Sequence, residues 1–235
     1  MSSQSIVAVV QVRMSSRRLP GKALRAIRGR ALLGHVIDRI RRCRTIDGLW
    51  IATSTDPDDD AIAEFARTEA VEFYRGALDD VAGRLVGAAV AARADALVRI
   101  NADSPLIDPA IVDRAVELYR SQRPDLVSNV VRRTFPKGQS VEVVAVAALK
   151  RAIEAMTTPD EREHVTPWFY ANPTRVRIIG FERTDQRPQM QLSVDTMEDL
   201  QRVEAILARL GGPAAAHGLD AIIAAANAIE HVDAP

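Results

Sequence analysis

Short apolar runs alternate with helical patterns along the first half of the chain. The first run, at residues 6–12, is rich in β-branched residues, and further strand-like runs cover residues 49–53, 71–74, 96–100 and 125–129. Between them, apolar residues recur every three or four positions, as on the buried stripe of a helix. Continuous apolar runs of this kind are typical of parallel strands that are buried on both faces. The alternation therefore predicts an α/β fold, a mostly parallel sheet with helices on both faces.

The rhythm changes after Asn129. We expect, in order, a basic loop, a strand, two helices, two strands and an amphipathic helix, over residues 132–139, 140–146, 147–156, 158–172, 175–181, 191–194 and 196–210. No repeat, linker or low-complexity segment divides the chain. We therefore expect one domain over residues 1–235, with a small excursion at 158–190 and a helical tail at 213–235.

Composition excludes several classes of protein. Hydrophobic residues make up 47% and charged residues 26%, which is ordinary for a globular protein. The sequence contains no run of about 18 apolar residues, the length needed to span a membrane. Aromatics are only 4%, so the core must consist of Val, Ile, Leu and Ala. Cys43 is the only cysteine, which rules out an intramolecular disulfide and favours a reducing compartment. With no secretory pattern at the N-terminus, we expect a cytoplasmic protein.

The charges are unevenly distributed although the net charge is zero. Eleven Lys or Arg residues and one acid, Asp38, lie between residues 13 and 44, whereas residues 47–80 hold ten acids and two bases. This distribution favours a local anion site over a surface that coats nucleic acid. We expect four of the basic residues to form a solvated helix face: Arg39, Arg41, Arg42 and Arg44.

A basic loop follows the first predicted strand, where ligands bind in open parallel sheets. Small residues in it let backbone amides approach a phosphate, and cations can donate charge-assisted hydrogen bonds. The residues concerned are Ser15, Ser16, Arg13, Arg18 and Lys22. The loop matches neither a Walker loop nor a G-x-G-x-x-G turn, so an ordinary structural loop is the alternative.

Two aspartates also stand at predicted strand ends. Asp103 follows the fourth strand, and Asp195 follows the last one. Carboxylates in such positions can hold Mg²⁺ against a triphosphate. The alternatives are a turn or helix cap at Asp103 and a capping box formed by Thr196 and Asp199. If the two strand ends are neighbours, the two carboxylates can share one ion.

Seven ordered blocks of the sequence resemble the SpsF-type branch of the cytidylyltransferases, relatives of the acylneuraminate and KDO cytidylyltransferases. The blocks are QVRMSSRRLPGKAL, LWIATSTDPDDDAIAEFA, FYRGALDDVAGRL, LVRINADSPLIDPAIVD, TFPKGQSVEV, DEREHVTPWFYANP and LSVDTMEDL. Two departures are visible. Ser15 and Arg17 stand where the family loop has glycine and threonine, and Ala102 and Ser104 flank Asp103 where the family has glycine and cysteine.

The resemblance implies a Rossmann-like nucleotidyltransferase fold. It implies transfer of CMP from CTP to a small anionic acceptor, a sugar acid or a phosphorylated or phosphonate metabolite, with release of pyrophosphate. The product would serve the synthesis of cell-surface polysaccharide or glycoconjugate. Mg²⁺ is the implied cofactor, held by Asp103 and Asp195. The implied catalytic residues are Asp103, which holds the metal, and Arg18 and Lys22, which neutralise the leaving pyrophosphate.

The matched blocks carry further expectations. The nucleotide-binding positions implied by the resemblance are Arg13, Ser15, Ser16, Arg18, Lys22, Ser54, Asp56, Gly76 and Arg84. The positions that could bind the acceptor are Lys137, Gly138, Gln139, Glu142, Arg162 and His164. A helix-entry turn explains Ser54 and Asp56 equally well, and a helix cap is the alternative role for Asp79.

Two other function classes stay open at this point. A nucleotide-sugar glycosyltransferase of the GT-A type would hold its metal with Asp-x-Asp, where this chain has Asn101-Ala-Asp103. A non-catalytic polyanion-binding protein would need aromatic residues among the bases, and none lies between Arg13 and Arg44.

The resemblance also implies a homodimer formed through residues 158–186, with Trp168, Phe169 and Phe181 as exposed apolar support. For the acceptor, a cationic group favours a phosphorylated or phosphonate compound over a keto-sugar acid. Its members are Arg132, Arg133, Lys137 and Arg162. A sugar hydroxyl would need a base, and His164 is the only candidate.

Overall fold

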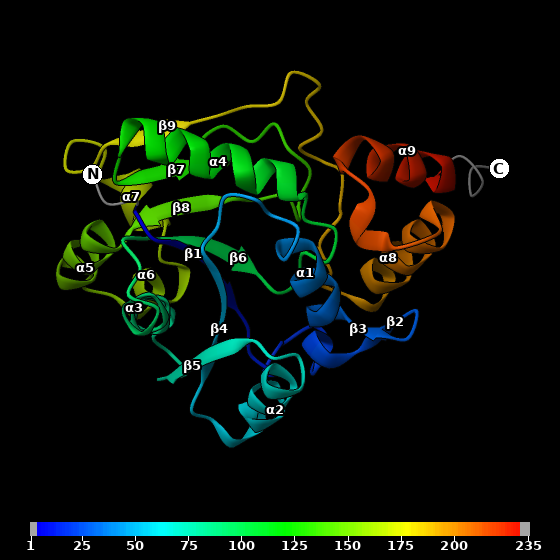
Figure 1. The fold of residues 1–235 in the computed structure, drawn as a ribbon, viewed down its shortest axis with the longest axis horizontal. Helices are drawn as coiled ribbons and strands as arrows, with labels where there is room; N and C mark the ends of the chain where they lie inside the picture. Colours follow the sequence, from blue (N-terminus) through cyan, green and yellow to red (C-terminus); the bar gives the residue numbers. More distant parts are fainter. Residues whose placement is uncertain (1–3, 231–235) are drawn as a thin grey trace.

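A seven-stranded sheet forms the centre of the computed structural model, which describes residues 4–230 (Figure 1). The strands run in the order β5-β4-β1-β6-β8-β7-β9. Their bounds are β1 Ile6–Gln11, β4 Gly48–Ser54, β5 Glu72–Gly76, β6 Ala96–Asn101, β7 Leu126–Ser128, β8 Glu142–Ala145 and β9 Ile178–Gly180. Every neighbouring pair is parallel except the two that involve β8, which pairs antiparallel with β6 and β7. The predicted mostly parallel sheet is confirmed.

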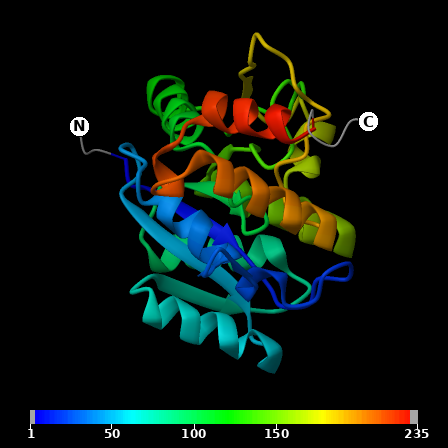
Figure 2. The same ribbon diagram turned by 90° about the vertical axis from the view of Figure 1, so that its right-hand side faces the viewer.

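Helices cover both faces of the sheet (Figures 1 and 2). They are α1 Leu32–Ile40, α2 Asp60–Thr68, α3 Val81–Ala91, α4 Pro109–Gln122, α5 Val146–Ala155, α6 Pro159–His164, α7 Pro167–Ala171, α8 Met197–Leu210 and α9 Leu219–Glu230. Short 3₁₀ turns lie at η1 Lys22–Leu24, η2 Pro57–Asp59 and η3 Ala214–Ala216, and a small hairpin pairs β2 Ala26–Ile27 with β3 Arg30–Ala31. No helix between residues 4 and 230 is long and apolar enough to cross a membrane.

The central strand β1 shows why two cores form. Successive side chains of a strand point to opposite faces. Ile6, Ala8 and Val10 pack in one core with residues of α1, α2, α4, α8 and α9. Val7 and Val9 pack in a second core with residues of α3, α5 and α7. The apolar run from Ile6 to Val10 of β1 is therefore required by burial on both sides.

Three element predictions are corrected by the structure. Residues 191–194 form no strand; Gln191 makes a single bridge to Lys137. The helix expected over 158–172 is split into α6 and α7 at Val165, whose φ is 67°, because the ring of Pro167 cannot continue the helix from α6. Asp80, not Asp79, caps α3 by accepting from the backbone N–H of Gly83. The predicted tail is represented by η3 and α9, and residues 231–235 lie outside the described residues.

The solvated helix face expected at Arg39, Arg41, Arg42 and Arg44 does not form, because α1 ends at Ile40 and only Arg39 lies within it. Arg41, Arg42 and Arg44 are exposed, but Arg39 is 1% exposed. Its Nη1 donates to the carbonyl oxygens of Ile107 (3.2 Å) and His217 (3.0 Å), and burial lowers its pKa to about 10. Arg39 therefore ties α1 to the turns that precede α4 and α9.

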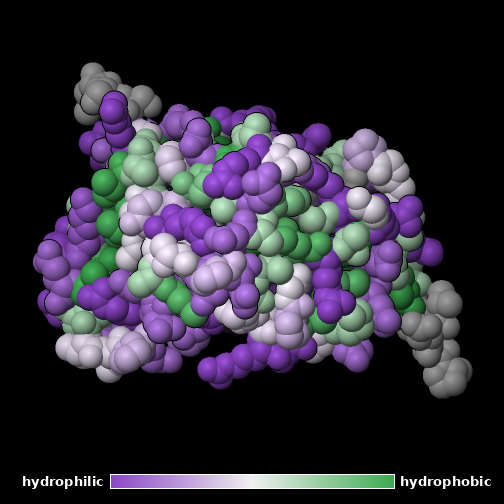
Figure 3. All heavy atoms as spheres, turned by 90° about the horizontal axis from the view of Figure 1, so that it is seen from below, coloured by the Kyte–Doolittle hydropathy of each residue, from purple (hydrophilic) through white to green (hydrophobic). Residues whose placement is uncertain are grey.

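The apolar residues offered for a dimer interface are buried within one chain. Trp168, Phe169 and Phe181 are 6%, 0% and 6% exposed. They pack in the two cores, so they no longer support a dimer, which stays a prediction. On the face that Figure 3 shows, apolar residues lie in several groups separated by hydrophilic ones.

Candidate active site

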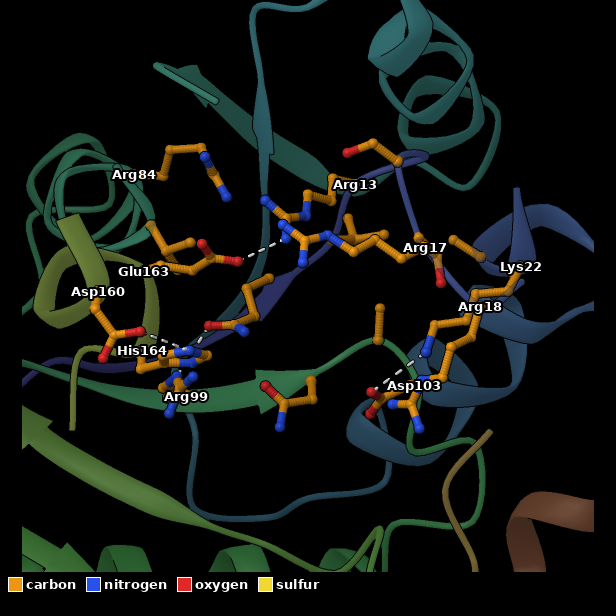
Figure 4. Close-up of a pocket in the computed structure, with 18 residues that line it drawn as sticks. Arg13, Arg17, Arg18, Lys22, Arg84, Arg99, Asp103, Asp160, Glu163 and His164 are labelled. Atoms are coloured by element: carbon orange, nitrogen blue, oxygen red, sulfur yellow. Dashed lines mark hydrogen bonds and ion pairs between the residues drawn. The ribbon is translucent and has the colours of Figure 1, made fainter. Parts of the chain in front are cut away.

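A cavity of about 580 Å³ opens at the carboxyl ends of β1 and β6 (Figure 4). The loop after β1 forms one wall, and α3 and α6 contribute residues to another. The lining residues are Gln11, Val12, Arg13, Ser15, Ser16, Arg17, Arg18, Lys22, Ala23, Val81, Arg84, Arg99, Asn101, Ala102, Asp103, Asp160, Glu163 and His164. Six of them are cations and three are acids, so the cavity suits an anionic ligand.

A buried carboxylate anchors the loop after β1 through hydrogen bonds. Asp59 is 1% exposed; its Oδ1 accepts from the backbone N–H of Met14 (2.7 Å), and its Oδ2 accepts from the backbone N–H of Ser54 (3.1 Å) and from the Ser54 hydroxyl. At its far end the loop turns at Gly21, whose φ of 69° favours glycine, and Gly21 N–H donates to the Met14 carbonyl (3.0 Å). These hydrogen bonds fix the backbone of the loop, which carries the basic side chains that face the cavity.

The two predicted metal ligands meet around one lysine. Lys22 Nζ lies 3.2 Å from Asp195 Oδ1 and 3.5 Å from Asp103 Oδ2, and it donates to the Val194 carbonyl (2.6 Å). Arg18 Nη2 lies 2.9 Å from the same Asp195 oxygen. The backbone N–H of Val194 donates to the Asp103 carbonyl (2.8 Å), which places the two carboxylates together without a strand at 191–194.

The chemistry of this pair fits a divalent cation. Burial raises the pKa of Asp103, Lys22 opposes that rise, and Asp195 adds to it. Oxygen ligands suit Mg²⁺, which is commonly bound by one or two carboxylates plus substrate phosphates. No third acidic, His or Cys side chain joins the pair in the part of the chain that the structure describes. The protein would therefore leave several coordination positions to a triphosphate and water.

The opposite wall connects the loop after β1 to α6. Arg13 Nη2 donates to Glu163 Oε1 (2.7 Å), and this arginine is the largest cause of a lowered Glu163 pKa. His164 Nε2 lies 3.4 Å from Asp160 Oδ1. Burial, followed by the charge of Arg13, lowers the pKa of Arg84, whose Nη1 donates to the Leu78 carbonyl (2.6 Å). These residues form the side of the cavity away from Lys22 (Figure 4).

The structure brings together most of the residues expected from the sequence. Those that line the cavity are Arg13, Ser15, Ser16, Arg18, Lys22, Arg84, Asp103 and His164. Asp195 joins them through Lys22. Three expected nucleotide contacts do not line it. Ser54 is buried against Asp59, Asp56 accepts from the Asp58 N–H at the start of η2, and Gly76 pairs with Ser54 in the sheet. Their structural alternative, a helix-entry turn, accounts for Ser54 and Asp56.

Several expected acceptor contacts also lie elsewhere. Gln139 is fully buried; its Nε2 donates to the Leu106 carbonyl (2.6 Å), and its Oε1 accepts from the Asp108 N–H (2.9 Å). Gly138 has a φ of 89°, and a Cβ there would lie 2.7 Å from the Leu192 backbone. These two residues build the turns behind Asp103 and have no side chain available to a ligand.

The remaining acceptor candidates are engaged outside the cavity lining. Lys137 is exposed, and its backbone bridges to Gln191. Arg162 Nη1 donates to Asp80 Oδ2 (3.1 Å), which ties α6 to the start of α3. Glu142 is 5% exposed and lies behind Arg99. Arg132 and Arg133 are exposed and do not line the cavity, so the cationic group expected to face the acceptor is not assembled there.

Arg99 is the main cavity residue that sequence reasoning missed. It interrupts the apolar run of β6, and a charge within a buried strand was the available signal. Four other polar lining residues were not predicted as site residues either: Gln11, Arg17, Asn101 and Asp160.

Comparison with known proteins gives one consistent result. Residues 7–221 match the family model described as Cytidylyltransferase. The chain is 29% identical to the spore coat polysaccharide biosynthesis protein SpsF of Bacillus subtilis, over 88% of each protein. It is 32% identical to the 3-deoxy-manno-octulosonate cytidylyltransferase of Solibacter usitatus, over 89% of this chain and 84% of that protein. A solved cytidylyltransferase from Leptospira borgpetersenii superposes with a TM-score of 0.92 at 25% identity, over 98% of this chain and 97% of that one.

Proposed function

Because the chain belongs to the cytidylyltransferase family, we propose that its cavity transfers CMP from CTP to a sugar acid and releases pyrophosphate. The observation that carries this proposal is the grouping of Lys22 and Arg18 with Asp103 and Asp195 beside the loop after β1. Membership in the family makes the protein a CTP-dependent nucleotidyltransferase. What is proposed is the acceptor, the cofactor and the role of each residue.

The proposed reaction is an in-line displacement at the α-phosphorus of CTP. An acceptor oxygen forms the new P–O bond, the bond to the bridging oxygen breaks, and pyrophosphate leaves with the negative charge. Lys22, Arg18 and the backbone amides of the loop after β1 neutralise that charge. Asp103 and Asp195 would hold Mg²⁺, which when bound neutralises phosphate oxygens. Catalysis is then positioning plus electrostatic stabilisation.

The acceptor end of the cavity is assigned to the side that holds α6. If the nucleophile is a sugar hydroxyl, it must lose a proton, and His164 is the imidazole on that wall. The earlier preference for a phosphorylated acceptor depended on Arg132, Arg133 and Lys137, which do not line the cavity. The names of the two curated relatives instead favour a sugar acid and a product used for polysaccharide.

The two alternative functions lose their support. The glycosyltransferase alternative is set aside by family membership. Polyanion binding would require a continuous basic surface, but the bases of the N-terminal third diverge. Lys22 faces the cavity, Arg30 pairs with Asp38 (2.8 Å) and with Glu69, and Arg39 is buried.

A substrate screen tests the proposal. The purified protein is incubated with CTP, Mg²⁺ and a panel of 2-keto sugar acids, with phosphorylated and phosphonate compounds as the comparison, and pyrophosphate release is measured. We expect release with a sugar acid and formation of its CMP conjugate. Turnover restricted to phosphorylated compounds, or no CTP turnover with any compound, would overturn the proposed acceptor.

A further inference from the structure

The strand β6 changes character where it reaches the cavity. Leu97, Arg99 and Asn101 lie on the same face of the strand, because successive side chains point to opposite faces. Leu97 packs in the core with α3 and α5. Two residues further on, the same face carries a guanidinium whose side chain is 13% exposed. Burying a cation this deeply is costly unless it is paired, so its partners show what the site is built for.

Arg99 is fixed on two of its three nitrogens. Its Nε donates to Gln11 Oε1 (2.9 Å), and its Nη1 donates both to Glu142 Oε2 and to Thr166 Oγ1 (2.9 Å each). Within residues 4–230, no partner is found for Nη2. Arg99 lines the cavity, where it lies with Asp160 and His164, across from Lys22 and Asp103 (Figure 4). An oriented donor is thus left for a ligand, away from the phosphate-binding side.

Glu142 is occupied by protein donors on both oxygens. Oε2 accepts from Arg99 and from the Thr166 hydroxyl (3.1 Å), and Oε1 accepts from the Tyr170 hydroxyl (2.5 Å). Tyr170 in turn lies 2.7 Å from the Ser128 hydroxyl on β7. Burial, and then the Glu142 charge, raises the pKa of Tyr170, which keeps its proton on the hydroxyl that Glu142 needs. Both Glu142 oxygens already accept hydrogen bonds from protein donors, and the Glu142 charge would repel an anionic acceptor.

We propose that Arg99 binds the carboxylate of the acceptor through Nη2, and that Glu142 is a positioning residue that aims it. This inference rests on the proposed sugar-acid function and names the group that would select for an acid. An arginine held by one carboxylate can donate to a second one, because its planar fork presents donors in fixed directions. Asn101 supports the assignment, since its buried Oδ1 has no partner and could accept from a sugar hydroxyl.

The test compares a charged with a neutral acceptor. The charged probe is 3-deoxy-manno-octulosonate. If the protein does not turn this compound over, the probe is the 2-keto sugar acid from the panel that is turned over. The neutral probe is the carboxamide of the same acid. Wild-type protein should prefer the acid by roughly 10²-fold in kcat/KM, the effect expected for a charge-assisted hydrogen bond. Arg99→Gln should lose that preference while the Kd for CTP, measured by calorimetry, changes by less than about threefold.

The controls separate positioning from folding. Arg99→Gln leaves Glu142 unpaired, so the double variant Arg99→Gln/Glu142→Gln removes that buried charge. Glu142→Gln alone should raise the KM for the acid roughly tenfold, and should add little once Arg99 is already Gln, because the two act as one unit. Arg17→Gln is the matched control, because Arg17 is a cavity arginine on the side where we expect the phosphates. This variant should raise the KM for CTP and keep the preference for the acid.

The outcomes distinguish the two proposals. No turnover of any sugar acid by wild type removes the proposed function, and this inference with it. Normal wild-type turnover, with an unchanged preference for the acid in folded Arg99→Gln, overturns the inference alone. A raised Kd for CTP in that variant, with the preference intact, would assign Arg99 to the nucleotide instead.

Discussion

Lys22→Met tests how the two carboxylates are held together. The substitution keeps most of the side-chain volume and removes the charge that lies 3.2 Å from Asp195 and 3.5 Å from Asp103. It also removes the hydrogen bond to the Val194 carbonyl. All three side chains are less than one-third exposed, so solvent screens the ion pairs only in part.

The expected loss of stability is moderate. Removing one partner of a hydrogen-bonded, partly buried charge costs about 1–3 kcal/mol. For a chain of this size, that corresponds to a fall in Tm of about 2–12 °C. Asp103 then loses the cation beside it, and Asp195 keeps only its ion pair with the exposed Arg18, so Mg²⁺ should stabilise the variant more than it stabilises wild type.

The measurement is thermal unfolding of both proteins in EDTA and in Mg²⁺, with pyrophosphate release as the activity assay. We expect turnover of the variant to fall by about 10²–10³-fold, because the variant lacks the cation proposed to neutralise the leaving pyrophosphate. Equal Tm values in EDTA together with unchanged turnover would refute the reasoning, both for the ion pairs and for the catalytic role of Lys22.

Four further predictions follow from the same contacts. Asp103→Ala and Asp195→Ala should each lower turnover by at least about 10²-fold in a folded protein, and near-normal Mg²⁺-dependent turnover would remove that residue from the proposed metal site. Arg18→Ala should raise the KM for CTP or lower kcat, measured by steady-state kinetics; unchanged values would leave its loop structural. Arg30 lowers the pKa of Glu69 below 4.5, so this pair stabilises the fold above that pH and the contribution is lost as pH falls through the lowered pKa. Glu69→Gln should therefore unfold less steeply in acid, and an identical pH profile would contradict this. Light scattering should show a homodimer, and a monomer that is stable to dilution would end that prediction.

The apolar runs identified the strands β1, β4 and β6 without any tertiary information. The clearest is Ile6 to Val10 of β1, which is buried on both faces and therefore leaves no room for polar residues. The same holds for the capping box of Thr196 and Asp199, because its hydrogen bonds are local to four residues. Structural features that depend only on residues close together in the sequence could therefore be predicted from the sequence.

Contacts between distant segments could not be predicted in this way. Residues 191–194 have a strand-like pattern but form no strand, because their backbone hydrogen bonds go to the loops at Lys137 and Asp103. From the sequence, Arg39 was predicted to be a solvated helix residue. In the structure it is buried and donates to the carbonyl of His217, 178 positions away in the chain. A periodic pattern reports which face of an element is apolar, but not which other segment lies against it.

The candidate site shows the same division. The sequence singled out Asp103 and Asp195 as carboxylates after predicted strands; the strand before Asp195 does not form, and only the tertiary structure set Lys22 between the two carboxylates. Arg99 appeared as a charge in an apolar strand, and its direction depends on Glu142, 43 positions later in the chain, and on the Thr166 hydroxyl. Residue chemistry is local and can be read from the chain; the direction of a side chain depends on partners that only folding brings within hydrogen-bond distance.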